Sequence, residues 1–199
     1  MLSDLKFSAS QLKDCKVDML VYGCTSGSMA CPKDLLIKTM EEAGGARAIS
    51  TAEAILKALE VLNLTRFSVA TPYSDSVNNH EKAFLESHGH EIVSIAGMQL
   101  SGQISKVSRV APAEVYKHAL SVNCKTSEAI LICCTDFGTL DVIDPLEKAT
   151  GKPVITSNTA SFWYALRNAG IKDKIKNVKA IGLVKNISQF PSNITRDCL

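Results

Sequence analysis

An internal repeat is the feature that most constrains this chain. Segments 17–26 and 127–136 begin 110 residues apart, and each is an apolar run of strand length that ends in a Cys-Thr pair. The match continues downstream in the same order, because segment 48–51 resembles 154–157 and segment 67–70 resembles 180–183. Two related halves packed about an approximate two-fold axis would bring both strand ends, and their thiols, together across a cleft.

Strand and helix patterns alternate along the sequence. Apolar runs of strand length occur at 18–22, 67–71, 91–96, 129–133, 153–156 and 179–184. Helical periodicity occurs between them, at 32–42, 52–62, 77–87, 112–122, 139–149 and 161–168. This alternation predicts the α/β class, with a mostly parallel sheet and helices on both of its faces.

The repeat also predicts unequal halves. A strand, helix, strand and helix precede the Cys134 strand in the second half, whereas only 16 residues precede the Cys24 strand. We therefore expect a first domain shortened at its amino terminus, formed by residues 1–64 with 165–199, and a second domain formed by 65–164. A shortened sheet exposes an edge, and exposed edges tend to be covered by a partner, so we expect a homo-oligomer or a locally disordered first domain.

Composition excludes several classes of protein. The 199 residues are 46% hydrophobic and carry a net charge of +2 from 22 basic and 20 acidic residues, with no basic cluster interleaved with aromatics. This argues against nucleic-acid partners, and no apolar run approaches the roughly 20 residues of a membrane span. Residues 1–16 lack the apolar core of a signal peptide, so we expect a cytoplasmic protein without a membrane partner.

Cysteine and glycine patterns argue against bound metals and nucleotides. The seven cysteines are odd in number and include no CxxC pair, which predicts neither a disulfide framework nor a structural zinc site. The spacing of the four histidines fits no zinc signature, and we expect them to face solvent. No GxGxxG or GxxxxGK[ST] motif is present, so we expect no cofactor.

Both Cys-Thr pairs follow predicted strands, and ligands of open α/β sheets bind beyond the carboxyl ends of the strands. Segment 23–28 is small and rich in hydroxyls, so its backbone N–H groups can approach a carboxylate and favour the thiolate form of Cys24. An equally good interpretation is a tight turn that requires small residues. Strand alternation allows only one of Cys133 and Cys134 to face the cleft, and the repeat aligns Cys134 with Cys24. A third strand end adds Tyr73, which could bind a carboxylate or merely pack in the turn.

These motifs together resemble the aspartate/glutamate racemase superfamily, most closely its maleate cis-trans isomerase and arylmalonate decarboxylase branch. The resemblance is carried, in order, by segment 22–28, segment 70–78, Cys134-Thr135 with 139–141, and segment 153–158. It implies two Rossmann-like parallel-sheet domains related by a pseudo-two-fold axis, an active site between them, and cofactor-independent chemistry through an enediolate-like state. The family's first strand and its Ser/Asn/Thr loop have no counterpart before Leu12.

The same resemblance implies roles for individual residues. The facing thiols would be those of Cys24 and Cys134, and a small carboxylate substrate would be held by Thr25, Ser26, Tyr73 and the backbone N–H of Thr135. The decarboxylases of the family keep only the second cysteine, and the amino-acid racemases carry Cys-Asn-Thr and Gly-Cys-Thr-His motifs that this chain lacks. We therefore expect an isomerase of the maleate-to-fumarate type. The alternatives are an amino-acid or hydantoin racemase, an arylmalonate-type decarboxylase, and a non-catalytic carboxylate-binding protein.

Overall fold

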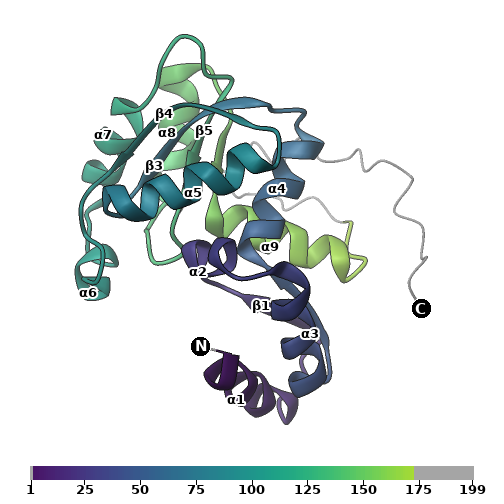
Figure 1. The fold of residues 1–199 in the computed structure, drawn as a ribbon. Coiled ribbons are helices and arrows are strands. Elements are labelled where there is room, and N and C mark those ends of the chain that lie inside the picture. Colours follow the sequence, from purple (N-terminus) through teal and green to yellow (C-terminus); the bar gives the residue numbers. More distant parts are fainter. Residues whose placement is uncertain (1, 173–199) are drawn as a thin grey trace.

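The computed structural model describes residues 2–172 and confirms the expected α/β class with parallel sheets (Figure 1). The predicted strand 179–184, and with it the repeat counterpart 180–183, lies outside the described residues. None of the described helices is both long enough and apolar enough to cross a membrane.

The smaller of the two sheets contains β1 (Met19–Tyr22) and β2 (Arg47–Ser50), paired in parallel so that Tyr22 lies opposite Ser50. Helices α1 (Leu2–Lys13) and α3 (Lys33–Gly44) pack against each other beside this sheet, and α2 (Thr25–Ala30) follows β1 directly (Figure 1). Gly44 permits the contact between α1 and α3, because a Cβ at this position would overlap with Leu20 and approach the Ala9 carbonyl.

The larger sheet has four parallel strands in the order β4 (Glu91–Gly97), β3 (Arg66–Thr71), β5 (Ala129–Ile132) and β6 (Val154–Thr156). Every residue of β5 is buried, as expected for a central strand covered on both faces. The accompanying helices are α5 (Asp75–Ser87), α6 (Ile104–Val107), α7 (Pro112–Ser121) and α8 (Leu140–Thr150).

Two helices, α4 (Thr51–Val61) and α9 (Ser157–Asn168), pack on each other between the two sheets (Figure 1). Hydrogen bonds join them from Ser161 to Thr51 (3.0 Å) and from Tyr164 to Glu53 (3.1 Å). Each helix directly follows a strand and starts at a polar cap: Ser50 accepts the Glu53 N–H, and Thr156 accepts the Thr159 N–H. Because α9 crosses residue 165, the proposed division into domains stays a prediction.

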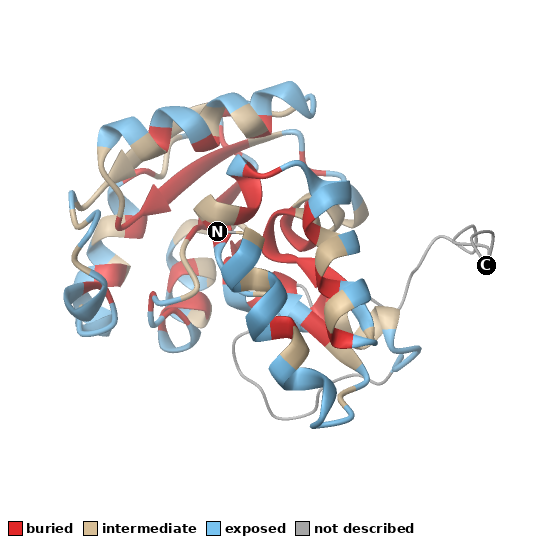
Figure 2. Cartoon of the chain, turned by 60° about the horizontal axis from the view of Figure 1, so that its bottom comes forward, coloured by how far each residue is buried: buried red, intermediate tan, exposed pale blue. Residues whose placement is uncertain are grey.

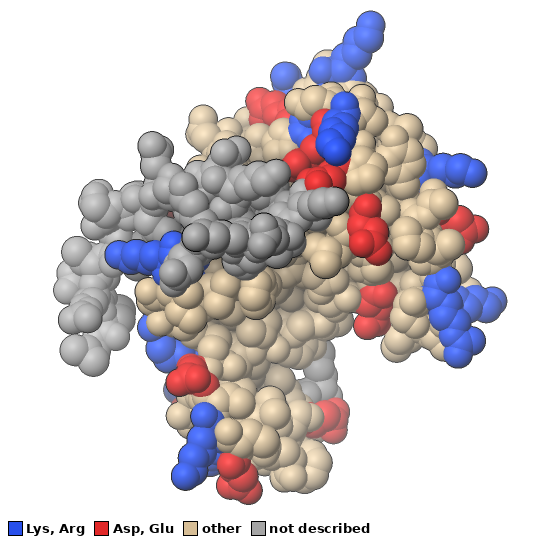
Figure 3. Space-filling view, turned by 180° about the vertical axis from the view of Figure 1, so that it is seen from behind, with Lys and Arg blue, Asp and Glu red and all other residues tan. Residues whose placement is uncertain are grey.

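One buried cluster spans both sheets and includes Ile49, Ile55, Phe67, Leu131 and Trp163. Figure 2 shows the buried residues concentrated on the strands and on the inner sides of the helices. On the face shown in Figure 3, acidic and basic side chains are interspersed without a large patch of either sign.

Three helices, α1, α2 and α6, were missed by the sequence patterns. The α1 stretch has a weak apolar periodicity, and most of segment 23–28, expected to be a turn, lies in the short helix α2 instead. The start of α9 is also earlier than expected, at Ser157 instead of Ser161, since the polar residues after β6 form a capping box and not a loop. Both strand–helix–strand–helix repeats are present, but the rotation that relates them stays a prediction.

Candidate active site

The carboxyl ends of β1 and β5 place Cys24 and Cys134 in one region. Cys24 is exposed and occupies the N-cap position of α2, whereas Cys134 is partly buried beyond the end of β5. Besides burial, a charge on Cys24 raises the pKa of Cys134, so the two thiols lie within electrostatic range of each other. The structure thus brings together the two cysteines that the repeat aligns.

Hydroxyl groups connect the two strand ends across the halves. The hydroxyls of Thr25 and Ser157 lie 2.8 Å apart, and the Cys134 N–H donates to both of them, at 3.3 Å and 3.1 Å. The Thr135 hydroxyl donates to the Gly23 carbonyl at 2.6 Å. These polar contacts therefore fix the second Cys-Thr pair against the first.

Cys134 has an unusual backbone conformation. Its φ of +92° lies in the region that side chains rarely adopt outside glycine. The hydrogen bonds of its own N–H, and the Asn158 side chain that donates to the Thr135 carbonyl at 3.0 Å, hold the chain in this conformation. Such strain collects where a side chain must be aimed at a particular point, which suits a reactive thiol.

The surroundings of Cys134 favour its protonated form. Burial raises the pKa of this thiol, and charges on Asp136 and Cys24 raise it further. The Tyr73 hydroxyl opposes this by donating a hydrogen bond to the sulfur, which lowers the pKa. Burial also raises the pKa of Tyr73 itself, so the phenol remains a donor. Cys134 is therefore placed to act as an acid with a phenol ready to stabilise its thiolate.

A tight loop between β3 and α5 positions Tyr73. The Tyr73 N–H donates to the Thr71 hydroxyl at 3.0 Å, and that hydroxyl donates to the side-chain oxygen of Asn78 at 2.6 Å. The Gln99 N–H donates to the Tyr73 carbonyl at 3.1 Å. Gly97 allows the Tyr73 backbone to lie close to the end of β4, because a Cβ at position 97 would overlap with the Tyr73 carbonyl oxygen.

The neighbourhood of Cys24 is more open. The Ser26 hydroxyl lies 4.0 Å from the Cys24 sulfur, and a Cβ at Gly27 would come within 3.1 Å of that sulfur. Glycine at position 27 therefore keeps the space beside this thiol free. Cys24 is thus accessible to a molecule that approaches from solvent.

The predicted site residues come together, although their catalytic and binding roles stay predictions. Cys24, Cys134, Tyr73 and Thr135 meet at the strand ends, and Thr25 is nearly fully buried below them with its hydroxyl between the two halves. Cys133 is fully buried, as expected. Sequence reasoning missed Ser157, although the repeat pairs it with Thr51, another hydroxyl residue that follows a strand.

None of the four histidines is among the residues that meet at the strand ends, and of the remaining cysteines in the described part of the chain only Cys133 adjoins them. All four histidines were expected to face solvent, but His90 and His118 are half-buried, and the Nε2 of His118 lies 2.9 Å from the Thr71 carbonyl and 3.2 Å from that of Ala96. Hydrogen bonding to Thr126 lowers the pKa of Cys124 to about 7, at a site distant from the strand ends. All six cysteines in residues 2–172 are free, and no group of His, Cys, Asp and Glu in this part of the chain could hold a metal ion.

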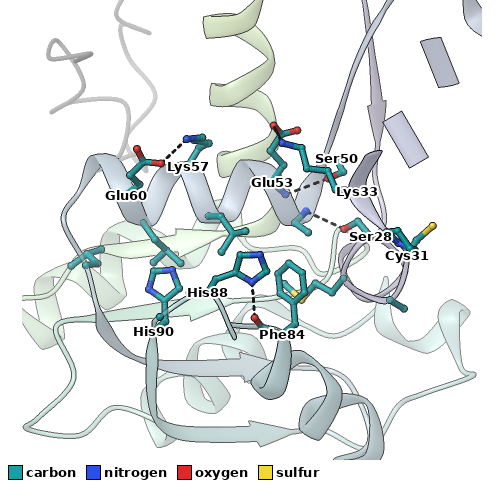
Figure 4. Close-up of a pocket in the computed structure, with 18 of the residues that line it drawn as sticks. Ser28, Cys31, Lys33, Ser50, Glu53, Lys57, Glu60, Phe84, His88 and His90 are labelled. Atoms are coloured by element: carbon teal, nitrogen blue, oxygen red, sulfur yellow. Dashed lines mark hydrogen bonds and ion pairs between the residues drawn. The ribbon is translucent and has the colours of Figure 1, made fainter. Parts of the chain in front are cut away.

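A cavity of about 820 Å³ lies between α2, α4 and the end of α5, and neither Cys24 nor Cys134 lines it (Figure 4). Its charged side chains are already paired, Lys33 with Glu53 at 2.8 Å and Lys57 with Glu60 at 2.7 Å. We assign the chemistry to the cysteine region because reactive groups converge there and not in this cavity.

Comparison with known proteins agrees with this geometry. The sequence profile described as arylmalonate decarboxylase matches residues 8–181, so the chain belongs to the arylmalonate decarboxylase family and the expected superfamily is confirmed. The arylmalonate decarboxylase of Bordetella bronchiseptica is 31% identical over 137 residues, which are 68% of this chain and 57% of that protein. The match thus spans little more than half of that relative's length.

Solved structures show the same fold. A crystal structure of arylmalonate decarboxylase is 26% identical, has a TM-score of 0.81, and matches over 92% of this chain and 82% of its own. The maleate cis-trans isomerase of Nocardia farcinica, as a cysteine-to-serine mutant with a covalently bound succinylcysteine intermediate, is 21% identical with a TM-score of 0.78. That match covers 83% of this chain and 71% of the isomerase.

Proposed function

We propose that this chain is a cofactor-independent isomerase of a small dicarboxylate, of the maleate-to-fumarate type. The observation that carries the proposal is the pair of cysteines in one region with unlike surroundings. Cys24 is exposed and free to attack, whereas burial raises the pKa of Cys134, which therefore holds a proton to donate. Unequal thiols suit a reaction that needs one nucleophile and one acid.

The reaction begins when the Cys24 thiolate adds to one vinyl carbon of maleate. The double-bond electron pair moves to the neighbouring carbon and its carboxylate, and the Cys134 thiol transfers its proton to that carbon. The product is a succinyl group on Cys24 whose central carbon–carbon bond is single and rotates. The Cys134 thiolate then removes a proton from the same carbon, the double bond forms again in the trans arrangement, and Cys24 leaves as a thiolate.

Hydrogen-bond donors stabilise the charge that develops on the substrate carboxylate. Ser26, Tyr73, Thr25 and the Thr135 N–H are the donors we assign to this role. A well-aimed donor contributes roughly 3 kcal/mol to such a transition state. The succinylcysteine in the related Nocardia isomerase, formed in a protein that lacks one cysteine, supports a covalent adduct on the other thiol.

An arylmalonate-type decarboxylase is the second candidate, because the 31% identity to arylmalonate decarboxylase favours it. This reaction requires only the Cys134 thiol, which would protonate the carbanion left when carbon dioxide departs. Cys24 would then be dispensable.

One pair of assays separates the candidates. Conversion of maleate to fumarate is followed by ultraviolet absorbance, and conversion of phenylmalonate to phenylacetate by chromatography, with the wild type and with Cys24→Ser. Maleate turnover that disappears in Cys24→Ser supports the isomerase, whereas phenylmalonate turnover that survives the substitution supports the decarboxylase. If the wild type turns over neither compound but binds succinate, the chain is a carboxylate-binding protein. We also propose the two-domain division given above. We further propose that the chain forms a homo-oligomer, and light scattering would test this by measuring the molar mass in solution.

A further inference from the structure

A buried carboxyl group lies behind the proposed site. Glu81, on α5, is 0% exposed, and neither of its carboxyl oxygens forms a well-aligned hydrogen bond with a described residue. Burial raises its pKa to about 8, while the neighbouring Cys133 thiol acts in the opposite direction. An unpaired buried carboxylate is costly, so the acid form is the favoured one at neutral pH.

Glu81 is connected to the site through a line of polar groups. It interacts with the Cys133 thiol, which also has a hydrogen bond with the Ser157 hydroxyl. Ser157 lies 2.8 Å from the Thr25 hydroxyl, and both accept the Cys134 N–H. Burial raises the pKa of Cys133 well above its usual value, so this thiol keeps its proton. The line therefore runs from Glu81 through Cys133 and Ser157 to Thr25.

Each group in this line has one proton to donate, so the direction of donation at one end constrains the direction at the next group. When Glu81 is an acid, its O–H donates to the Cys133 sulfur, the thiol donates to Ser157, and Ser157 donates to Thr25. The Thr25 hydroxyl then keeps its own proton for a ligand. When Glu81 is a carboxylate, the Cys133 thiol donates a hydrogen bond to it. Ser157 then donates to the Cys133 sulfur, and Thr25 donates to Ser157.

We propose that Glu81 is a positioning residue whose acid form directs the Thr25 hydroxyl toward a bound carboxylate. This inference rests on the proposed function, because it assigns a carboxylate ligand to the cysteine region. The titratable groups that face Glu81 are Cys133 and Tyr73, with Cys134 next to both. All three favour their neutral forms at neutral pH, because burial raises the pKa of each.

The test compares the wild type with Glu81→Gln, which can donate through its amide but cannot ionise. Affinity for succinate, an unreactive dicarboxylate, is measured by calorimetry from pH 6 to pH 9. We expect the wild type to lose about tenfold in affinity between pH 7 and pH 9, as one hydrogen bond to a charged ligand is lost, while Glu81→Gln changes much less. Ionisation of the site thiols affects both proteins, so the readout is their ratio at each pH.

Glu86→Gln on the same helix is the matched control, since Glu86 is exposed and lies near Lys82. Glu86→Gln should lose affinity for succinate between pH 7 and pH 9 as the wild type does. Ser157→Ala removes the group to which Thr25 would donate, so its affinity for succinate should not show the loss that follows Glu81 ionisation. If the ratio of the succinate affinity of the wild type to that of Glu81→Gln stays constant from pH 6 to pH 9, the inference is overturned. A purely structural glutamate predicts that result.

A second measurement needs no ligand. A carboxyl whose pKa is raised from its ordinary 4.5 to about 8 binds its proton more tightly in the folded chain. The folded state of the wild type is therefore favoured most below the unfolded pKa and loses stability relative to Glu81→Gln as the pH rises toward 8. Urea denaturation at pH 5 and pH 8 should show this divergence in the free energy of unfolding. If the wild type and Glu81→Gln differ by the same amount at both pH values, Glu81 is not held in its acid form.

The outcomes also separate this inference from the proposed function. Succinate binding with the same pH dependence in both proteins contradicts the role of Glu81 alone. Failure of the wild type to bind either succinate or maleate at any pH contradicts the proposed function, and with it the carboxylate ligand assigned to Thr25.

Discussion

The two Cys-Thr pairs of this chain are similar in sequence and different in surroundings. Cys24 is exposed, begins a short helix of small residues, and has a glycine beside its sulfur. Cys134 is partly buried, has a φ of +92°, and receives a hydrogen bond from Tyr73. A duplicated motif has thus acquired an accessible thiol in one half and a constrained, protonated thiol in the other. The difference supports the proposed roles of nucleophile and acid, which the repeat alone does not distinguish.

The largest effects should follow from removing each thiol in turn. Cys24→Ser and Cys134→Ser should each lower maleate turnover by about 10³-fold or more, since a hydroxyl without an adjacent base is a poor nucleophile and a poor acid here. The variants should differ in what accumulates. Mass spectrometry of Cys134→Ser incubated with maleate should show a mass increase on the Cys24 peptide, because addition precedes the proton transfers.

An adduct found on Cys134 in the Cys24→Ser protein would reverse the assignment. Retained turnover in both variants would remove the two-thiol mechanism altogether. Cys31→Ser, which changes a buried thiol outside the site, is the control for handling and refolding.

Removal of the Tyr73 hydroxyl should have the next largest effect. Tyr73→Phe loses the donor that stabilises the Cys134 thiolate, so the pKa of Cys134 should rise further and turnover should fall roughly 10²-fold. The alkylation rate of Cys134, measured against pH, should shift to higher pH. Tyr116→Phe on α7 should leave both quantities unchanged, and an unshifted profile in Tyr73→Phe would show that the phenol does not act on this thiol.

A smaller effect is expected from crowding the Tyr73 loop. Gly97→Ala places a Cβ against the Tyr73 carbonyl, so the loop must move, at a cost of about 1–3 kcal/mol in the free energy of unfolding. Urea denaturation measures the loss. Gly138→Ala is the matched control, because a Cβ there meets nothing within 4 Å. Equal stabilities of the two variants would mean that the loop adapts without strain.

The smallest effect concerns the exposed thiols themselves. Iodoacetamide near neutral pH should alkylate Cys24 roughly tenfold faster than Cys15, although both are exposed, because Cys24 lies at the N-cap of α2. Peptide mass spectrometry over time gives both rates. Cys124 must be scored separately, because its pKa of about 7 predicts an alkylation midpoint near that pH. Equal rates at Cys24 and Cys15 would favour the carboxylate-binding alternative.

The sequence was informative where chemistry follows from strand ends. The apolar runs before Cys24 and Cys134 predicted the strands, and the repeat predicted that their ends meet across a cleft between two halves. The structure places the two strands in separate sheets, and their carboxyl ends lie together. The repeat could not reveal how unequal the thiols become. That difference arises from burial, from Tyr73 and from Ser157, and these two residues are distant in sequence and reach Cys134 or its backbone only after folding.

Helix α1 and the buried state of Glu81 escaped prediction for other reasons. The α1 helix is stabilised by its contact with α3 and not by a strong apolar stripe of its own, so tertiary packing decides its structure. A glutamate in a helix of mixed polarity is usually exposed, and nothing in the α5 sequence marks Glu81 as the exception.

The polar contacts between Gly23, Thr25, Thr135 and Ser157 have a mechanical consequence. They fasten the two halves to each other at the floor of the same region that we assign to substrate. A ligand that accepts a hydrogen bond from Thr25 would share that hydroxyl with Ser157, while the Thr135 bond to Gly23 is independent of it. A substitution at Thr25 would therefore change both the contacts to a ligand and the contacts that join the two halves.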